Sequence, residues 1–252
     1  MLRAAGLAKE FGGVRAVEAL DFEIREGQVF SIIGPNGAGK TTLLNLLTGI
    51  YRPSAGRLWL AERPLAARAP HEFAAAGIGR TFQNLQIFFN MSALENVMAG
   101  RHLHERCSVA AALLRAPRLA RAEHACRRLA AELLEFVGLG AYALAAADAL
   151  PYGALKRLEI ARALAGEPRL LLLDEPAAGL NPSEIRDIDR LIQAIAARGI
   201  TVVLVEHNMK LVMGVSHHVL VLDYGRKLAE GAPDAVRSDP RVIEAYLGAG
   251  ES

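Results

Sequence analysis

Short runs of apolar residues alternate with helical patterns through most of the chain. Residues 29–33 and 170–173 are almost wholly apolar, which is typical of strands buried on both faces. Each run is followed by a segment with helical periodicity, residues 40–48 after the first and Pro182–Ala197 after the second. This alternation predicts an α/β fold of the P-loop type, with a mainly parallel sheet.

Further apolar runs extend the pattern on both sides. Thr201–Val205 and residues 219–222 are expected to be two more strands of the parallel sheet. The first third of the chain also has β-rich segments punctuated by turns, including residues 20–24 and 57–60. We expect these segments to form a small antiparallel β layer beside the core.

The middle of the chain has no strand pattern. Ser92 with Glu95 three positions later is a capping box that opens a helix, and residues 118–136 form a long helical pattern rich in alanine and arginine. We predict one domain over residues 1–252. Its core comprises residues 1–83 and 156–252, and residues 84–155 form an inserted helical subdomain. The arginines suit a nucleic-acid or lipid surface, but such charges more often form a solvated helix face.

Composition narrows the choice of partners. The 252 residues carry a formal net charge of only +2, so there is no strong electrostatic case for nucleic acid. No apolar stretch reaches the roughly 18 residues that a membrane span needs, and residues 1–3 do not begin a signal peptide. We expect a cytoplasmic protein that partners hold at any membrane where it works.

A phosphate-binding loop joins the first buried strand to the helix after it. Residues 34–41 match G-x-x-x-x-G-K-[ST] in the strand–loop–helix context that this motif requires. Its glycines let backbone N–H groups crowd around phosphates, and the helix N-terminus points its positive end at them. A glycine-rich turn without a ligand is the alternative, which the complete motif disfavours. The predicted nucleotide contacts are Gly34, Pro35, Asn36, Gly37, Ala38, Gly39, Lys40, Thr41 and Thr42, and the Thr41 hydroxyl also binds Mg²⁺.

Two acids end the second buried strand. A sheet interior rejects unpaired charge, so Asp174 and Glu175 are expected to have a function there. Asp174 is placed to hold Mg²⁺ through water, and Glu175 is placed to accept a proton from the attacking water. The alternative is an acid pair that caps the next helix. Together with the phosphate loop, these acids predict hydrolysis of ATP with Mg²⁺.

Further motifs make the chain resemble the ATP-binding subunit of an ATP-binding cassette (ABC) transporter over residues 2–247. The resemblance implies that Phe11 stacks on adenine and that Ala16 is among the nucleotide contacts. It implies that Gln83 contacts Mg²⁺ and the attacking water, and that His207 contacts the γ-phosphate and assists catalysis. Taken alone, an early phenylalanine is more often a core residue, and a strand-end histidine is more often a surface residue.

Two segments resemble parts of the family that act across a dimer. Residues 150–154 match the signature segment before its helix, although an ordinary loop is the alternative, and Asn181 belongs to the D-loop motif. In the family two subunits form a head-to-tail dimer around two ATP molecules, so Gly153 and Asn181 are expected to act in trans. The usual serine, second glycine and glutamine of the signature are replaced by Pro151, Tyr152 and Ala154. A hydroxyl contact to the γ-phosphate is thereby lost, whereas the backbone contact at Gly153 can survive.

Finer details resemble the ATPase subunits of branched-chain amino acid importers. They are the Leu-Pro-Tyr-Gly sequence of the signature, the ending at residues 245–248 and the arginine-rich stretch between residues 100 and 128. This resemblance implies a second ATPase subunit, identical or a sister, integral membrane permease subunits and, indirectly, a solute-binding protein. It places the chain at the cytoplasmic face of the inner membrane. The apolar residues expected either to dock the permease or to be buried are Leu85, Ile87, Phe88 and Phe89.

Other functions stay open at this point. The chain could energise import of another solute, such as urea, because the transported solute never touches this subunit. A soluble ABC ATPase acting on ribosomes or DNA is a rival of a different class, and a regulatory nucleotide-binding module without useful turnover is another. The single cassette and weak net charge disfavour the former, and Glu175 with His207 disfavours the latter.

Overall fold

A computed structural model describes residues 1–65, 69–102 and 117–248 of the chain. Within these ranges the central sheet has the strand order β10-β9-β3-β8-β7-β6, and only the β9–β10 pair at its edge is antiparallel. The strands are β3 (Val29–Ile33), β6 (Ile78–Arg80), β7 (Leu170–Asp174), β8 (Thr201–Val205), β9 (His218–Asp223) and β10 (Arg226–Gly231). The prediction of a mainly parallel α/β sheet is confirmed.

The buried strands are apolar on both faces because both faces are covered. In β7, Leu171 and Leu173 pack with helices α6 (Tyr152–Ala165) and α7 (Pro182–Ala197), whereas Leu170 and Leu172 pack with α1 (Lys40–Leu47). This division follows from the two-residue period of a strand, which sends successive side chains to opposite sides. The carboxyl ends of β3 and β7 thus lie in a rigid, dry sheet.

A second, antiparallel sheet closes over the other side of α1. It has the order β2-β1-β4-β5 and comprises β1 (Leu2–Phe11), β2 (Val14–Ile24), β4 (Ala55–Leu60) and β5 (Arg63–Pro64). Leu43, Leu44 and Leu47 of α1 share one buried cluster with residues of both sheets. The helix that follows the phosphate loop is therefore held between two sheets, which confirms the predicted antiparallel layer.

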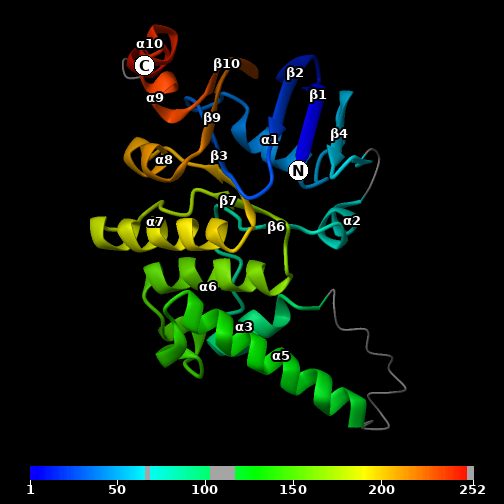
Figure 1. Ribbon diagram of the computed structural model, residues 1–252, viewed down its shortest axis with the longest axis vertical. Helices are drawn as coiled ribbons and strands as arrows, with labels where there is room; N and C mark the ends of the chain where they lie inside the picture. Colours follow the sequence, from blue (N-terminus) through cyan, green and yellow to red (C-terminus); the bar gives the residue numbers. More distant parts are fainter. Residues whose placement is uncertain (66–68, 103–116, 249–252) are drawn as a thin grey trace.

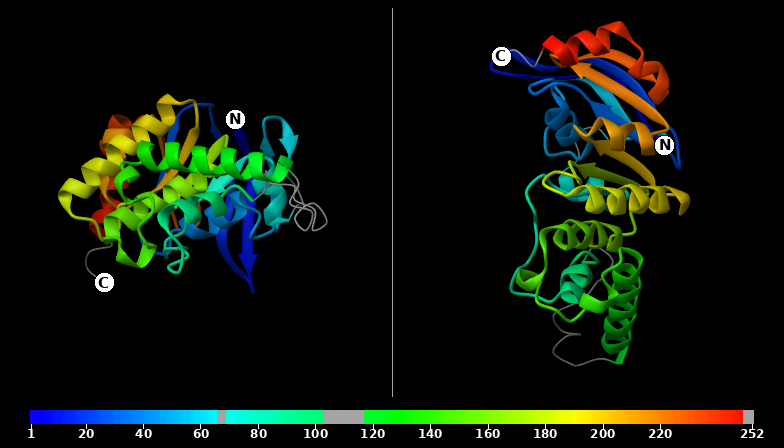
Figure 2. Two further views of the ribbon diagram at one scale, coloured as in Figure 1. Left: turned by 90° about the horizontal axis from the view of Figure 1, so that it is seen from below. Right: turned by 90° about the vertical axis from the view of Figure 1, so that its left-hand side faces the viewer.

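The remaining helices complete the core and build a lower lobe (Figure 1). The lobe contains α3 (Ala93–Ala99), α5 (Pro117–Phe136) and the short turns η1 (Gly140–Tyr142) and η2 (Ala147–Ala149). The core is completed by α2 (Pro70–Ala75), α8 (Met209–Val215), α9 (Pro233–Arg237) and α10 (Pro240–Gly248). The right-hand view of Figure 2 also shows this lobe apart from the antiparallel sheet, with α6 and α7 between them.

The predicted capping box at the start of α3 is present. The Ser92 hydroxyl accepts the Glu95 N–H at 3.2 Å, and the Glu95 carboxylate accepts the Ser92 N–H at 2.8 Å. The predicted subdomain boundary at residue 155 stays a prediction, since α6 begins at Tyr152 and packs both on the lobe and on α7. Much of the arginine-rich stretch lies in residues 103–116, outside the described residues.

Four predicted strands were too short, and those predicted at 57–60 and 219–222 gain only one or two residues at their ends. The strand predicted at 170–173 continues to Asp174, which can end a buried strand because its charge is paired. The strand predicted at 20–24 is the second half of β2, which begins at Val14 and pairs with β1 through a tight hairpin. None of the described helices is both long enough and apolar enough to cross a bilayer.

Candidate functional site

The phosphate loop holds its own lysine. The Lys40 ammonium donates to the carbonyl oxygens of Gly34 at 2.7 Å and Pro35 at 2.8 Å, and the residue is only 7% exposed. Burial lowers the pKa of Lys40, while the nearby carboxylates of Glu175 and Asp174 act in the opposite direction. The cation is thus stored inside the loop, at hydrogen-bond distance from backbone oxygens and close to the acids of β7.

Two glycines of the loop have no substitute. Gly34 has φ +154°, and a Cβ there would lie 2.2 Å from the Leu222 carbonyl oxygen. Gly39 has φ +95°, and a Cβ there would lie 2.3 Å from the Ala16 carbonyl oxygen. Backbone packs directly on backbone at both positions, so the loop is fixed before any ligand arrives. This contact also brings Ala16, a predicted nucleotide contact, beside the loop.

The outer part of the loop is open to solvent. Asn36 and Gly37 are exposed, as is Thr41 in the first turn of α1, while Thr42 is half-buried and Ala38 is buried. The N-terminal turn of α1 therefore presents a hydroxyl and backbone N–H groups on the side of the loop that a phosphate chain can reach.

Three predicted catalytic residues meet at one carboxylate. The Gln83 amide donates to Glu175 Oε2 at 3.0 Å, and His207 Nε2 lies 2.9 Å from Glu175 Oε1. Glu175 itself has φ 49°, a left-handed conformation that an L-residue adopts only where its surroundings hold it. Both carboxylate oxygens are thereby held, from two segments far apart in the sequence.

Asp174 has a partner that the sequence analysis missed. Arg80, the last residue of β6, donates from Nη2 to Asp174 Oδ2 at 2.9 Å, and the two side chains are 7% and 6% exposed. The alternative of an acid pair that caps the next helix is wrong, because Asn181 performs that capping. The clue was present: an arginine in a buried strand, three residues before Gln83, requires an anion.

Two more buried charged residues organise the site. Lys156 of α6 is 2% exposed and donates to the backbone oxygens of Gln83 and Glu175, both at 3.4 Å. Glu206, 3% exposed, accepts the N–H groups of Ala177 at 2.8 Å and His207 at 3.0 Å. The strand-end argument applied to Asp174 also identifies Glu206, whereas no pattern in the sequence singles out Lys156.

Known proteins are similar to this chain over nearly its whole length. A family model described as ABC transporter matches residues 17–178, and one described as branched-chain amino acid ATP-binding cassette transporter matches residues 226–252. The chain belongs to the ABC transporter family. It is 44% identical to the high-affinity branched-chain amino acid transport ATP-binding protein BraF of Pseudomonas aeruginosa, over 98% of both chains. LivG of Escherichia coli, with the same description, is 41% identical over the same shares.

Solved ABC cassettes have the same fold. The ADP conformation of MJ1267, an ATP-binding cassette of an ABC transporter, superposes with a TM-score of 0.86 at 33% identity and covers 98% of each chain. The dimeric bacterial ABC transporter cassette MJ0796 gives 0.78 at 25% identity, over 92% of this chain and 99% of that one. The predicted family and fold class are confirmed, and the chain is an ABC ATPase.

The signature segment of this ABC cassette begins α6 without a side-chain cap. Pro151 is the N-cap residue and has no hydroxyl to offer. Gly153 is buried, and a Cβ there would lie 2.3 Å from Glu184 Oε1, so the first turn of α6 packs tightly against the first turn of α7. A side chain at position 153 would therefore force the Glu184 side chain, which takes part in the cap of α7, to move.

Asn181 caps its own helix. Its side-chain oxygen accepts the N–H groups of Ser183 at 2.9 Å and Glu184 at 3.1 Å. The Glu184 carboxylate in turn accepts the Asn181 N–H at 2.9 Å. The side chain thus has a complete role inside the chain, and contact of Asn181 with a partner subunit stays a prediction.

Phe11 is not a core residue. Its ring is 42% exposed and stands edge-on to Tyr51, with centroids 5.1 Å apart. The Lys9 ammonium lies 4.8 Å from the centroid of this ring and 5.8 Å from the centroid of the Tyr51 ring. An exposed ring steadied by neighbours can accept a flat base, so the geometry agrees with the predicted adenine contact.

The apolar segment after Gln83 splits into two pairs. Ile87 is buried, and Leu85 is partly buried against the apolar cluster that contains residues of α6 and α7, so neither can form a docking surface. Phe88 and Phe89 are 46% and 48% exposed. The predicted four-residue docking surface is therefore reduced to these two phenylalanines.

The C-terminal helix reaches back to the phosphate loop. Tyr246 of α10 packs against the cluster that contains Ile33, the residue before the loop. Burial raises the pKa of Tyr246 to about 12, and the backbone of Gly34 acts in the opposite direction. The C-terminal ending that resembles branched-chain importers thus lies beside the nucleotide site.

Proposed function

We propose that this ABC ATPase hydrolyses Mg²⁺-ATP at the site formed by the phosphate loop, Asp174 and Glu175, and thereby energises import of branched-chain amino acids. The observation that carries the chemical part is the Glu175 carboxylate, held on one oxygen by Gln83 and on the other by His207. The assignment of the transported solute rests on relatives that are named for branched-chain amino acid transport and are 41–44% identical to this chain.

Binding begins with a transfer of hydrogen bonds. Lys40 exchanges the carbonyl oxygens of Gly34 and Pro35 for the β- and γ-phosphate oxygens. The exchange keeps the buried ammonium satisfied throughout, so its desolvation cost is already met before ATP arrives. Phe11 takes the adenine, and Ala16 lies beside the loop on the same side of the site.

The residues around the phosphates suit Mg²⁺. Among the described residues there is no cluster of three acidic, histidine or cysteine side chains that would enclose a metal. Mg²⁺ usually takes one or two carboxylates together with phosphate oxygens, and it prefers oxygen ligands. Asp174, through water, with the Thr41 hydroxyl and the Gln83 amide oxygen, provides that donor set. When bound, the ion neutralises charge that develops on the phosphate oxygens.

Glu175 acts as the general base. Its position at the carboxyl end of β7, close to Lys40, lets it accept a proton from a water aligned with the γ-phosphate. Gln83 and His207 prevent rotation of the carboxylate, and His207 then reaches the γ-phosphate from the other side. Correct orientation of this kind is a large part of what an enzyme contributes to such a displacement.

A second copy of the cassette completes each site. The N-terminus of α6 has free N–H groups at Tyr152 and Gly153, where a γ-phosphate held by the partner can bind. The partner is this same chain or a sister ATPase, and membrane permease subunits hold the pair at the cytoplasmic face of the inner membrane. A solute-binding protein delivers the solute from the far side.

Transport by the reconstituted complex tests this function. The chain, its permease subunits and the solute-binding protein are placed in liposomes loaded with ATP and Mg²⁺, and uptake of labelled leucine is followed with isoleucine, valine and urea as competitors. We expect uptake that requires ATP and is suppressed by the branched-chain amino acids only. Suppression by urea alone would reassign the solute, and hydrolysis without any uptake would point to a soluble ABC ATPase.

A further inference from the structure

Arg80 contacts four residues from three parts of the nucleotide site through one guanidinium group. Nη1 donates to Asn45 Oδ1 at 2.7 Å and to Thr48 Oγ1 at 3.2 Å, at the end of α1. Nη2 donates to Asp174 Oδ2 at 2.9 Å, at the end of β7. The ring of Phe82, the residue before Gln83, lies 5.0 Å from the guanidinium carbon. The side chain is therefore clamped between the phosphate helix, the acidic strand and the catalytic glutamine segment.

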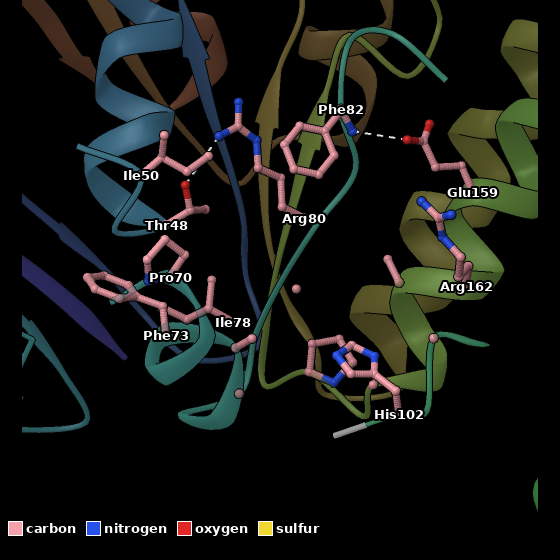
Figure 3. Close-up of a pocket in the computed structure, with 17 residues that line it drawn as sticks. Thr48, Ile50, Pro70, Phe73, Ile78, Arg80, Phe82, His102, Glu159 and Arg162 are labelled. Carbon is pink, nitrogen blue, oxygen red and sulfur yellow. Dashed lines mark hydrogen bonds between the residues drawn. The ribbon is translucent and has the colours of Figure 1, made fainter. Parts of the chain in front are cut away.

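The surroundings of Arg80 exclude a surface role. Its side chain is 7% exposed, and it lies at the head of a cavity of about 360 Å³ between the core and α6. Figure 3 shows the guanidinium between Thr48 and the ring of Phe82, while the other arginine of the cavity, Arg162, lies across it on α6. Arg80 Nε is buried without a hydrogen-bond partner among the described residues. A buried cation in such a place persists only if its charge is used.

We propose that Arg80 is a positioning residue for the metal site: it fixes the Asp174 carboxylate so that Oδ1 alone is presented to the hydrated Mg²⁺. The inference rests on the proposed function, in which Asp174 holds the ion through water. Arg80 touches neither ATP nor metal in this scheme, and it acts only through the carboxylate.

The physical reason is competition between two cations. Asp174 is 5% exposed and close enough to Lys40 to influence its pKa. Without Arg80, the buried carboxylate would pair directly with the Lys40 ammonium, since an unpaired charge there is costly. That pairing would withdraw the acid from the metal and the lysine from the phosphates. The guanidinium prevents it because it already holds Oδ2 of Asp174.

The planar shape of the Arg80 guanidinium, with its donors in two directions, is needed as well as its charge. A guanidinium donates in two directions in one plane, which lets Arg80 bond to α1 and Asp174 together. A lysine at this position carries the charge as a single point and cannot bridge both partners. The metal affinity of Arg80→Lys is therefore expected to lie between those of the wild type and Arg80→Met.

Metal affinity measured directly tests the inference. Binding of Mn²⁺ to the chain saturated with a non-hydrolysable ATP analogue is followed by electron paramagnetic resonance, beside the free Mg²⁺ concentration that gives half-maximal hydrolysis. Loss of an outer partner of a metal ligand typically costs about 10–100-fold in affinity. We expect Mn²⁺ affinity to fall about tenfold or more in Arg80→Met and by less in Arg80→Lys, with binding of a fluorescent ATP analogue in EDTA weakened far less.

A matched control lies in the same cavity. Arg162 is also partly buried and lies 5.6 Å from the ring of Phe88, but it has no contact with Asp174. Arg162→Met should keep the wild-type affinity for Mn²⁺. An equal loss in this variant, or unchanged Mn²⁺ affinity in Arg80→Met, overturns the inference.

Milder variants decide the matter if Arg80→Met does not fold. Asn45→Ala and Thr48→Ala leave the buried ion pair intact and remove only its anchor on α1. Together they should weaken Mn²⁺ binding several-fold while ATP binding in EDTA is kept, and no change in Mn²⁺ binding overturns the inference. If the wild type itself shows no nucleotide-dependent Mn²⁺ binding, the proposed metal site fails, and the inference fails with it.

Discussion

At the scale of single residues, the site is a chain of charges in which each has a defined partner. Lys40 is held by backbone oxygens, Asp174 by Arg80, and Glu175 by Gln83 and His207. Buried charges are tolerated only when they are paired and hydrogen-bonded, so the network stabilises itself while leaving one acid in position for chemistry.

Replacement of Glu175 tests the base directly. Glu175→Gln keeps the size and one oxygen of the side chain but removes the proton acceptor. Steady-state phosphate release should fall by roughly 10²–10⁴-fold, the range usual for loss of a general base. Binding of a fluorescent ATP analogue should stay close to the wild type, since Lys40 and the loop are unchanged. Turnover near the wild-type rate would remove Glu175 from the base role.

Lys156 gives a second prediction at this scale. Its ammonium joins the backbone of Gln83 to that of Glu175, so it should set their separation and not the binding of ATP. Lys156→Met is expected to lower kcat roughly tenfold, because hydrogen bonds from a charged group are worth about 1.5–3 kcal/mol. KM for ATP should change little.

The adjacent Arg157 provides the control for that measurement. It donates to the Val137 carbonyl oxygen at 3.2 Å, on the side of α6 that faces the helical lobe. Arg157→Met should leave kcat unchanged. If both variants lower kcat equally, the effect comes from general damage to α6.

The sequence identified some of these residues and not others, for a physical reason. Phosphate-loop residues follow a fixed spacing, and acids at a strand end violate the apolar pattern, so Lys40, Asp174 and Glu175 are visible without a structure. Arg80 lies 94 positions before Asp174, and Lys156 lies 73 positions after Gln83. No local spacing in the sequence records contacts over such separations. Gln83 and His207 were found only through the resemblance.

At the scale of elements, α6 connects the lobe to the site. Its side chains bond to Gln83 and to the residue before it: Glu159 accepts the Phe82 N–H at 3.1 Å, and Lys156 donates to the Gln83 carbonyl oxygen at 3.4 Å. The helix therefore links the signature segment at its start to the catalytic glutamine. The buried strands were predictable from their uniform apolar character, but this function of α6 depends on which faces meet, which the sequence alone does not record.

The pH dependence of stability tests the packing of α6. Burial raises the pKa of Glu159 above its usual 4.5, because the charged form is poorly solvated. A raised folded-state pKa gives stability that is fully present below the unfolded pKa and is lost as pH rises through the folded pKa. Glu159→Gln still offers an oxygen to the Phe82 N–H and does not ionise. The variant should therefore gain stability relative to the wild type as pH rises from about 4 to 8.

Urea unfolding at several pH values measures this difference. Glu132→Gln, which changes an exposed carboxyl group on α5, is the control and reports the general effect of removing a charge. A stability difference between Glu159→Gln and the wild type that does not vary with pH, or that varies in the opposite direction, would show that Glu159 is well solvated in the folded protein.

At the scale of the whole molecule, the proposed function gives the cassette one surface for its own nucleotide and another for the nucleotide of a neighbour. The phosphate loop lies between the two sheets, while the start of α6 lies at the start of α7, where Gly153 meets Glu184. In this proposal each chain offers both halves of a site, so two chains arranged head to tail would complete two sites. The fold was predictable to this level, but the strength of the dimer was not, because it depends on the side chains at positions 151–154.

Restoring the usual serine of the signature tests that strength. Pro151 is the N-cap of α6 in an extended conformation (φ −64°, ψ 155°) that serine also adopts, so Pro151→Ser should fold normally. Its hydroxyl can cap α6 in the free chain and reach the γ-phosphate across a dimer. In the Glu175→Gln background, which preserves bound ATP, the substitution adds one hydrogen bond to a charged group at each of the two sites of the dimer. We expect each bond to contribute about tenfold, so the dissociation constant of the ATP-dependent dimer should fall roughly 100-fold. Sedimentation velocity with ATP over a range of protein concentrations measures the dimer fraction.

The effect of the serine on the stability of α6 must be separated from its effect on the dimer contact. An N-cap serine alone stabilises a helix by about 0.5–2 kcal/mol. The unfolding midpoint of the monomer without nucleotide reports the cap alone. If Pro151→Ser raises only the monomer midpoint and leaves the ATP-dependent dimer unchanged, the start of α6 does not face a partner's ATP. The head-to-tail arrangement would then have to use another surface of the cassette.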